Sequence, residues 1–141
     1  MQAPGSENSL PLPFPNGDSQ PYWDAARERR LLIRQCKACG VLHFMPRHLC
    51  PTCWSDQLEW VDASGTGTVH SFTVIRRAPA AAFAPRVPYV LAMIELDEGP
   101  RMIANVLGED ALETRIGDRV KVCFEDRGGG ALMPQFNRTA A

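Results

Sequence analysis

The sequence has no large excess of charge of either sign, few aromatic residues and no long apolar run. Its 141 residues carry 15 basic and 16 acidic side chains, a net charge of −1, and 8% of the residues are aromatic. No overall electrostatic field therefore draws the chain to a nucleic acid or an anionic membrane. No stretch approaches the roughly 18 apolar residues of a membrane-spanning helix. The N-terminus also lacks the basic start and apolar run that are typical of a secretory signal peptide.

Cysteines are few, but four of the five form two closely spaced pairs. The sequence contains Cys36-Lys-Ala-Cys39 and Cys50-Pro-Thr-Cys53, with ten residues between the pairs. Each Cys-x-x-Cys turn directs two sulfurs at one point, and two such turns can form a tetrahedral four-thiolate site. The spacing predicts structural zinc bound by Cys36, Cys39, Cys50 and Cys53, with iron as the alternative metal. Two disulfides or redox-active pairs are the alternatives to a metal. Four protein ligands leave no open coordination position, so we expect the metal to hold structure.

The residues around the two pairs refine this prediction. Gly40 follows the first pair and can take the left-handed conformation that a turn around a metal needs, whereas Trp54 stands where a second glycine is expected. We therefore expect the second turn to close less tightly. His43 and His48 lie close by and are predicted to be surface residues, because four thiolates complete the site. A thiolate metal site and the odd fifth cysteine, Cys123, together predict a cytoplasmic protein.

The N-terminal part divides into an arm and a helix that leads into the metal ribbon. Residues 1–17 hold four prolines and no apolar period, which predicts an extended arm. A helix is expected over residues 22–34, after an N-cap at Asp18 or Ser19. Its aromatic end, Tyr22 and Trp23, is either a partner-docking surface or packs on the chain's own ribbon. Residues 18–60 are thus predicted to form one helix and a rubredoxin-like zinc ribbon.

From residue 58 onward the pattern becomes that of strands. Alternating apolar and β-branched residues predict five strands, a loop over 78–88, a helical turn after the third strand, and a hairpin at the three successive glycines. This order is typical of an OB-type Greek-key barrel, predicted for residues 61–141. The predicted fold class is therefore mostly β, with a short N-terminal helix and zinc ribbon before a five-stranded barrel. The strands are expected at 68–75, 89–96, 101–107, 119–125 and 131–136.

Charge is distributed unevenly along the chain. Residues 21–50 carry six basic and two acidic side chains, whereas residues 91–126 carry nine acidic and four basic ones. A basic front suits a protein that docks one face onto something anionic or acidic. The alternative is an ordinary solvated helix face beside a metal site.

The combination of parts resembles a known family. Over residues 20–137 the chain is similar to the thiolase-associated proteins that join a rubredoxin-like zinc ribbon to an OB-fold, long described as a domain of unknown function. The cysteine pairs recur in many ribbons, and it is their combination with the Gly-Thr-Gly and Pro-Tyr strands that makes the resemblance specific. The matching stretches are 21–23 (PYW), 31–40 (LLIRQCKACG), 46–53 (PRHLCPTC), Trp60, 65–73 (GTGTVHSFT), 88–89 (PY), 98–99 (EG) and 116–118 (IGD).

The resemblance implies a non-catalytic accessory subunit. Members of the family bind thiolase-fold enzymes, including acetyl-CoA acyltransferases, hydroxymethylglutaryl-CoA synthase and steroid side-chain aldolases. In such complexes the OB-fold helps to hold or pass on the acyl-CoA substrate, while the partner enzyme performs the carbon–carbon chemistry. The family pattern carries over no catalytic residue, and none is named.

The basic residues of the predicted barrel indicate, independently of the resemblance, whether acyl-CoA could bind there. Coenzyme A presents phosphate groups, which call for arginine or lysine side chains. Arg76 and Arg77 end the first barrel strand and Arg86 lies in the following loop, a region without acidic residues. We expect these three residues to line an anionic-ligand or partner surface. The alternative is that they are unpaired surface arginines.

The strongest rival function is binding of single-stranded nucleic acid, because zinc ribbons and OB-folds both serve that purpose. It would use the basic stretch 21–50 and stacking aromatics such as Phe72, Tyr89 and Phe124. The balanced charge and the alternation that places Phe72 and Phe124 in a barrel core disfavour it. An enzyme acting alone is not expected, because the three glycines 128–130 are followed by neither Lys-Ser/Thr nor a helix, and the three histidines form no constellation.

Overall fold

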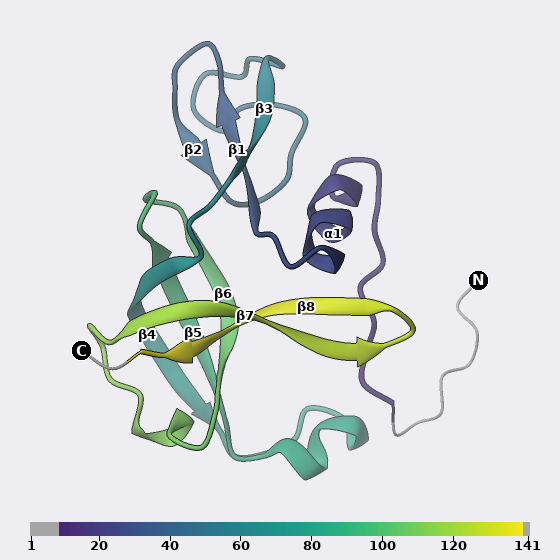
Figure 1. Ribbon diagram of the computed structural model, residues 1–141, viewed down its shortest axis with the longest axis vertical. Coiled ribbons are helices and arrows are strands. Elements are labelled where there is room, and N and C mark those ends of the chain that lie inside the picture. Colours follow the sequence, from purple (N-terminus) through teal and green to yellow (C-terminus); the bar gives the residue numbers. More distant parts are fainter. Residues whose placement is uncertain (1–8, 140–141) are drawn as a thin grey trace.

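The computed structural model describes residues 9–139, which form a small three-stranded ribbon above a five-stranded barrel (Figure 1). The fold is mostly β with one short helix, which confirms the predicted class. Two short 3-10 helices, η1 and η2, lie between barrel strands. The elements are α1 Gln20–Arg27, β1 Leu32–Cys36, β2 Leu42–His43, β3 Leu58–Asp62, β4 Thr66–Ile75, η1 Ala81–Arg86, β5 Tyr89–Leu96, β6 Arg101–Leu107, η2 Ala111–Glu113, β7 Arg119–Gly128 and β8 Ala131–Arg138.

The helix is shorter than predicted. It begins after Ser19, whose backbone N–H donates to the side-chain oxygen of Asn16 at 2.9 Å, and it ends at Arg27. Arg29 then takes a left-handed conformation with φ of 60°, which turns the chain away from the helix axis. The prediction of helix as far as residue 34 was wrong, because the apolar residues from Leu32 onward are buried as strand β1 and pair with β3. Tertiary pairing overrides helix propensity here.

The ribbon is an antiparallel sheet in the order β2-β1-β3. Its central strand β1 pairs along its whole length with β3, from Leu32 opposite Asp62 to Cys36 opposite Leu58. Strand β2 is only two residues long and pairs with β1 at Arg34 and Gln35. The sheet therefore ends at the first cysteine, and it presents both metal-binding turns at the end of the ribbon.

The barrel closes in the strand order β4-β5-β6-β8-β7. All its junctions are antiparallel except β6 with β8, which is parallel. The predicted hairpin between β7 and β8 is confirmed, since Gly128, Gly129 and Gly130 all have positive φ. A Cβ at Gly67 would lie 2.6 Å from the carbonyl oxygen of Glu95, so β4 and β5 approach closely only because this residue is glycine.

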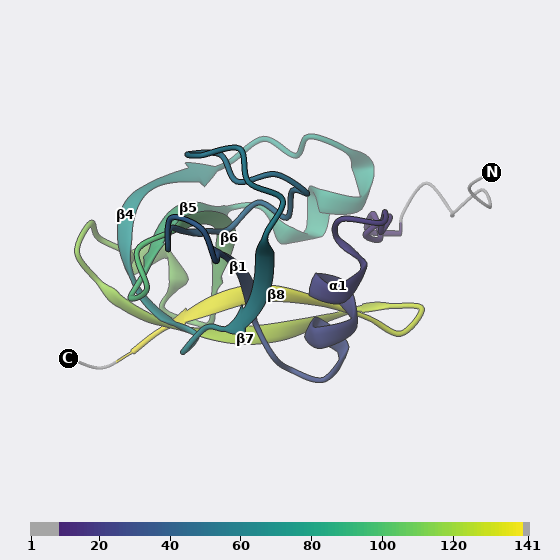
Figure 2. The same ribbon diagram turned by 90° about the horizontal axis from the view of Figure 1, so that it is seen from above.

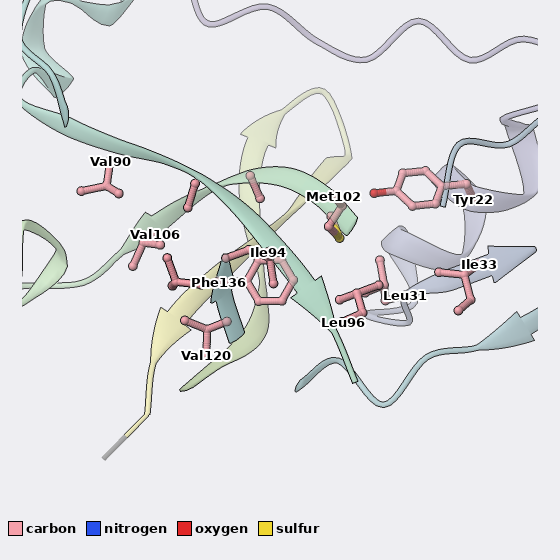
Figure 3. Packing of buried hydrophobic residues seen from close by; sticks show 13 residues of the cluster. Tyr22, Leu31, Ile33, Val90, Ile94, Leu96, Met102, Val106, Val120 and Phe136 are labelled. Carbon is pink, nitrogen blue, oxygen red and sulfur yellow. The ribbon is translucent and has the colours of Figure 1, made fainter. Parts of the chain in front are cut away.

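One hydrophobic core joins the two parts of the chain. Tyr22 of α1 and Leu31 and Ile33 of the β1 segment belong to the same buried cluster as the barrel interior (Figure 3). The helix lies against β8 (Figure 2). The predicted boundary between the ribbon (residues 18–60) and the barrel (residues 61–141) remains a prediction. Residues on both sides of it share one buried cluster. The barrel members of the cluster include Val69, Val90, Ile94, Leu96, Met102, Val106, Val120 and Phe136.

The described part of the N-terminal arm lies on the β7–β8 hairpin. A guanidinium nitrogen of Arg127 donates to the carbonyl oxygen of Pro11 at 3.3 Å, and Leu12 approaches Gly129. Residues 1–8 of the predicted arm lie outside the described residues. In the described range, no helix has the length and apolarity that crossing a membrane requires.

Candidate metal centre and neighbouring surfaces

The two cysteine turns have the same backbone hydrogen bonds. In the first, Gly40 N–H donates to Cys36 O at 2.8 Å; in the second, Trp54 N–H donates to Cys50 O at 3.0 Å. Gly40 has φ of 80° and Trp54 has φ of 67°, so both close the turn in the left-handed region. Gly40 confirms the expected conformation, whereas the second turn closes like the first despite its tryptophan. For a residue with a Cβ this conformation costs roughly 1–2 kcal/mol.

The four sulfurs converge on one point. Cys36 Sγ lies 3.6 Å from Cys53 Sγ and Cys39 Sγ lies 3.6 Å from Cys50 Sγ. All four atoms lie within 4.8 Å of one another, and the cysteines form no disulfide. Sulfurs bound tetrahedrally at the Zn–S distance are about 3.8 Å apart. The donor set and its spacing therefore fit a tetrahedral metal ion, as the spacing of the pairs predicts.

Backbone donors favour the thiolate of Cys50. The N–H groups of Thr52 and Cys53 point at Cys50 Sγ, with distances of 3.4 and 3.5 Å. Burial by itself raises the pKa of Cys50, but these donors and the adjoining thiols of Cys39 and Cys53 outweigh it and lower the pKa to about 6. The fold thus stabilises the charged form of this ligand before a cation contributes.

The two histidines beside the cysteines differ in their surroundings. His48 is exposed, as predicted, and its ring nitrogen lies 3.9 Å from Asp18. His43 is buried, so its prediction as a surface residue was wrong: β2 turns its ring inward, where Nδ1 lies 3.0 Å from the carbonyl oxygen of Met45. Burial lowers the pKa of His43 and favours its neutral form. Neither histidine belongs to the sulfur cluster.

The two aromatic residues at the start of α1 have different surroundings: Tyr22 packs inside the molecule, whereas Trp23 lines a groove. Tyr22 is only 7% exposed, and its ring meets Trp23 and Phe44 edge to face, with centroids 4.9 and 5.6 Å apart. Trp23 is half-buried and lines a groove of about 420 Å³ between α1, the ribbon and the barrel. The role of Tyr22 and Trp23 in partner binding remains a prediction, and the burial of Tyr22 leaves Trp23 as the more accessible of the two.

That groove, called here the β6–β8 groove, has mostly apolar walls with two amides among its lining residues. The lining includes Met45 of the ribbon, Ile103 and Asn105 of β6, and Met133 and Gln135 of β8. The buried side chains of Asn105 and Gln135 bond to each other, with the amide nitrogen of Gln135 donating at 3.2 Å. Sequence reasoning did not find this groove, because its walls come from segments far apart in the chain and no motif links them.

The three arginines predicted to bind an anion are not equivalent. Arg86 donates to Glu125 at 2.8 Å, and Arg127 donates to the same carboxylate at 2.7 Å. Burial alone would raise the pKa of Glu125, but the two guanidinium groups lower it. Arg76 and Arg77 are exposed and have no ion pair within residues 9–139. Anion binding by all three arginines remains a prediction. Arg76 and Arg77 have charges that are free for an anion, whereas the charge of Arg86 is already paired.

Comparisons with known protein families agree with this architecture. Residues 23–59 match the ChsH2 rubredoxin-like zinc ribbon domain, and residues 60–125 match the ChsH2 C-terminal OB-fold domain. A DUF35 domain-containing scaffold protein of Methanocaldococcus jannaschii is 36% identical over 104 residues, which are 72% of this chain and 73% of that protein. The chain belongs to the DUF35 family.

Other relatives of this DUF35 protein carry more specific names. A probable enoyl-CoA hydratase alpha subunit of Thermomonospora curvata is 42% identical over 126 residues, which are 89% of this chain and only 39% of that protein. A benzoylsuccinyl-CoA thiolase subunit, BbsA, of Geobacter metallireducens is 36% identical over 75 residues, 53% of this chain and 49% of the relative. The chain thus spans less than half the length of either of these two relatives.

Solved structures confirm the fold. A chain of a structure titled Ltp2-ChsH2(DUF35) aldolase superposes with a TM-score of 0.81 at 35% identity, covering 91% of this chain and 99% of the other. A DUF35 protein of unknown function from Sulfolobus solfataricus gives a TM-score of 0.63 at 15% identity, covering 88% and 87% of the two chains, and shows the fold alone.

Proposed function

We propose that this DUF35 protein is a non-catalytic accessory subunit of a thiolase-fold enzyme that acts on acyl-CoA thioesters. The observation that carries the proposal is the near-complete match to the DUF35 chain in a structure titled as an aldolase. The names of other relatives support it, since BbsA is called a subunit of a thiolase and the archaeal relatives are called scaffold proteins. The carbon–carbon chemistry is assigned to the partner enzyme.

The names of two relatives mention hydratase alpha subunits, and this does not transfer to the chain. The chain spans 39% of one of these proteins and 41% of the other. Most of each hydratase subunit therefore has no counterpart here, so their names do not assign hydration chemistry to this part. The scaffold names belong to relatives of which the chain covers 73%, 68% and 74%.

For the metal centre, we propose structural zinc. The four sulfurs fit its tetrahedral thiolate coordination, and a complete set of protein ligands leaves no position for substrate. One bound metal per chain, measured by elemental analysis of protein purified without added metal, tests the site. Zinc leaves the protein colourless, whereas iron bound to four thiolates absorbs visible light and would replace zinc in the proposal.

For acyl-CoA, we propose that the barrel binds the anionic part of the substrate through Arg76, Arg77 and Arg86. Arg76 and Arg77 offer unpaired charges, and Arg86, held by Glu125, fixes the loop that follows β4. The test replaces all three residues with Ala and measures coenzyme A binding by the assembled complex. Weaker binding supports the proposal, and unchanged binding removes this surface from it.

The accessory-subunit proposal is tested first by the proteins that co-purify with the tagged chain from its native host. A thiolase-fold enzyme in near-stoichiometric amount, identified by mass spectrometry, is the expected result. Nucleic acid or transcription components without such an enzyme would favour the rival reading, single-stranded nucleic-acid binding. The same sample supplies the partner enzyme for the binding measurements.

A further inference from the structure

The barrel is closed by only a short pairing between β6 and β8. These strands pair in parallel at only two positions, Val106 with Phe136 and Leu107 with Asn137. On the other side of β6, six residues pair with β5. Toward Arg101, β6 has no paired strand on the side away from β5 within residues 9–139, and the β6–β8 groove lies at this separation. The barrel therefore has a strand edge within a groove.

The backbone groups of this edge can be assigned from the hydrogen-bond alternation. Antiparallel strands alternate between residues that bond to the neighbour and residues that face away from it. Asn105 N–H donates to the side chain of Gln135 at 2.6 Å, away from β5, so Arg101 and Ile103 face the same way. Within residues 9–139 no backbone hydrogen bond outside the sheet pairing involves these two residues, and β6 pairs with β8 only at Val106 and Leu107, so the alternation leaves their N–H and C=O groups unpaired.

The opposite strand is protected, and β6 is not. Phe136 faces β6 in the parallel pair, so Pro134, two residues earlier, also faces the separation. Proline has no N–H to offer, which is how natural sheets blunt an open edge. On β6, Ile103 turns its backbone N–H and C=O toward the separation, and its apolar side chain is 62% exposed. Met45, which also lines the groove, is 57% exposed. The free N–H donor of this separation is thus on the β6 side, next to an exposed apolar side chain.

We propose that the β6 edge at Arg101 and Ile103 accepts an extended segment of the partner enzyme as an added strand, which fills the separation between β6 and β8. The inference rests on the proposed function and names where its partner binds. Unpaired N–H and C=O groups recur at every second residue, a repeat of about 6.6–6.8 Å that an extended polypeptide matches. Alternate side chains of the added strand would contact Ile103 and Met45 on one face and the Met102 side of the groove on the other.

Amide hydrogen exchange of the chain alone and in the complex with the co-purified partner enzyme tests the proposal. In the free chain the amide of Ile103 exchanges rapidly, whereas Met102 and Ala104, which face β5, are protected in both states. In the complex the Ile103 amide becomes protected by about 100-fold or more, because it now donates to the added strand.

A matched pair of variants completes the test. Ile103→Lys places a charge on the open edge, which opposes strand addition, and we expect at least about tenfold weaker binding of the partner enzyme. Ile116→Lys is the control, because Ile116 is a comparably exposed apolar residue, 70%, outside the groove, and it should bind as the unaltered chain does. Both side chains are exposed, so neither variant is expected to unfold.

The outcomes separate the inference from the function on which it rests. Strand addition is overturned if the complex forms without protection of the Ile103 amide, or if the Ile103→Lys and Ile116→Lys variants bind the partner enzyme equally tightly. Either result leaves the accessory function standing. Protection of Ile103 by coenzyme A alone, or by self-association of the chain, assigns the groove to another occupant and also overturns strand addition. Failure of the unaltered chain to bind any thiolase-fold enzyme overturns both proposals.

Discussion

Between residues 37 and 60 only His43 and Cys50 are buried, whereas in the barrel nearly every second residue of β5 and most of the middle of β6 are buried. The ribbon thus has almost no apolar interior beyond β1, and its two turns are joined by four convergent sulfurs. A segment of this size cannot stabilise itself by burial. We therefore expect the two regions to differ in what holds them together, with the ribbon depending on a metal bound by its sulfurs and the barrel on its core.

The largest expected effect comes from breaking the ribbon at its metal. Cys39→Ser should lose stoichiometric metal and leave the ribbon disordered, because structural zinc contributes on the order of 10 kcal/mol in such modules. Elemental analysis and the NMR spectrum of the ribbon measure both effects. Cys123→Ser is the control, since Cys123 lies outside the sulfur cluster. Stoichiometric metal in Cys39→Ser would show that the ligand set is wrong.

The next effect tests the barrel side of the comparison. Phe136 is fully buried in the core, and Phe136→Ala should lower the free energy of unfolding by about 3–5 kcal/mol. Phe14→Ala removes the same ring from a position that is 79% exposed and should change it by less than about 0.5 kcal/mol. Urea denaturation of the metal-loaded protein measures both. Equal effects of the two substitutions would contradict the assignment of the core.

A smaller effect compares the two cysteine turns with each other. Trp54 adopts the left-handed conformation that Gly40 adopts without cost, and its side chain is 77% exposed. Trp54→Gly should therefore stabilise the ribbon by about 1 kcal/mol, since the strain is relieved and little buried surface is lost. Competition with a chelator measures the resulting change in metal affinity. A metal held less tightly in Trp54→Gly would mean that the indole ring supports the turn.

The smallest effect concerns pH and the end of the barrel. Hydrogen bonds to Asp97 lower the pKa of its carboxyl group from 3.8 to about 2, and the bond from Arg119 contributes more than the bond from Thr66. A carboxyl whose pKa is lowered by folding contributes stability above its unfolded pKa and loses it as the pH falls toward 2. Both partners are about half exposed, so the contribution is below about 1 kcal/mol. Asp97→Asn should flatten the stability profile between pH 4 and 2, measured by denaturation, and an unchanged profile would contradict this pairing.

Features that depend on short-range chemistry could be predicted from the sequence. The two Cys-x-x-Cys turns bring their own sulfurs together, and alternating residues identify the barrel strands, because each rule operates within a few residues. Leu32 and Ile33 misled the helix prediction, since a short apolar run fits either a helix or a buried strand. His43 and the β6–β8 groove could not be predicted, because both are defined by segments that meet only in the folded chain.

The shared core has a consequence for how this chain can be divided. Leu31 and Ile33 precede the cysteines in sequence, yet their side chains belong to the buried cluster of the barrel. A barrel expressed alone from residue 61 would expose the apolar surface that α1 and β1 cover, and the excised ribbon would carry apolar residues with nothing to cover them. A chimera between relatives should therefore exchange α1 and residues 31–35 together with the barrel, and transplant only the segment from Cys36 onward that carries the two cysteine turns.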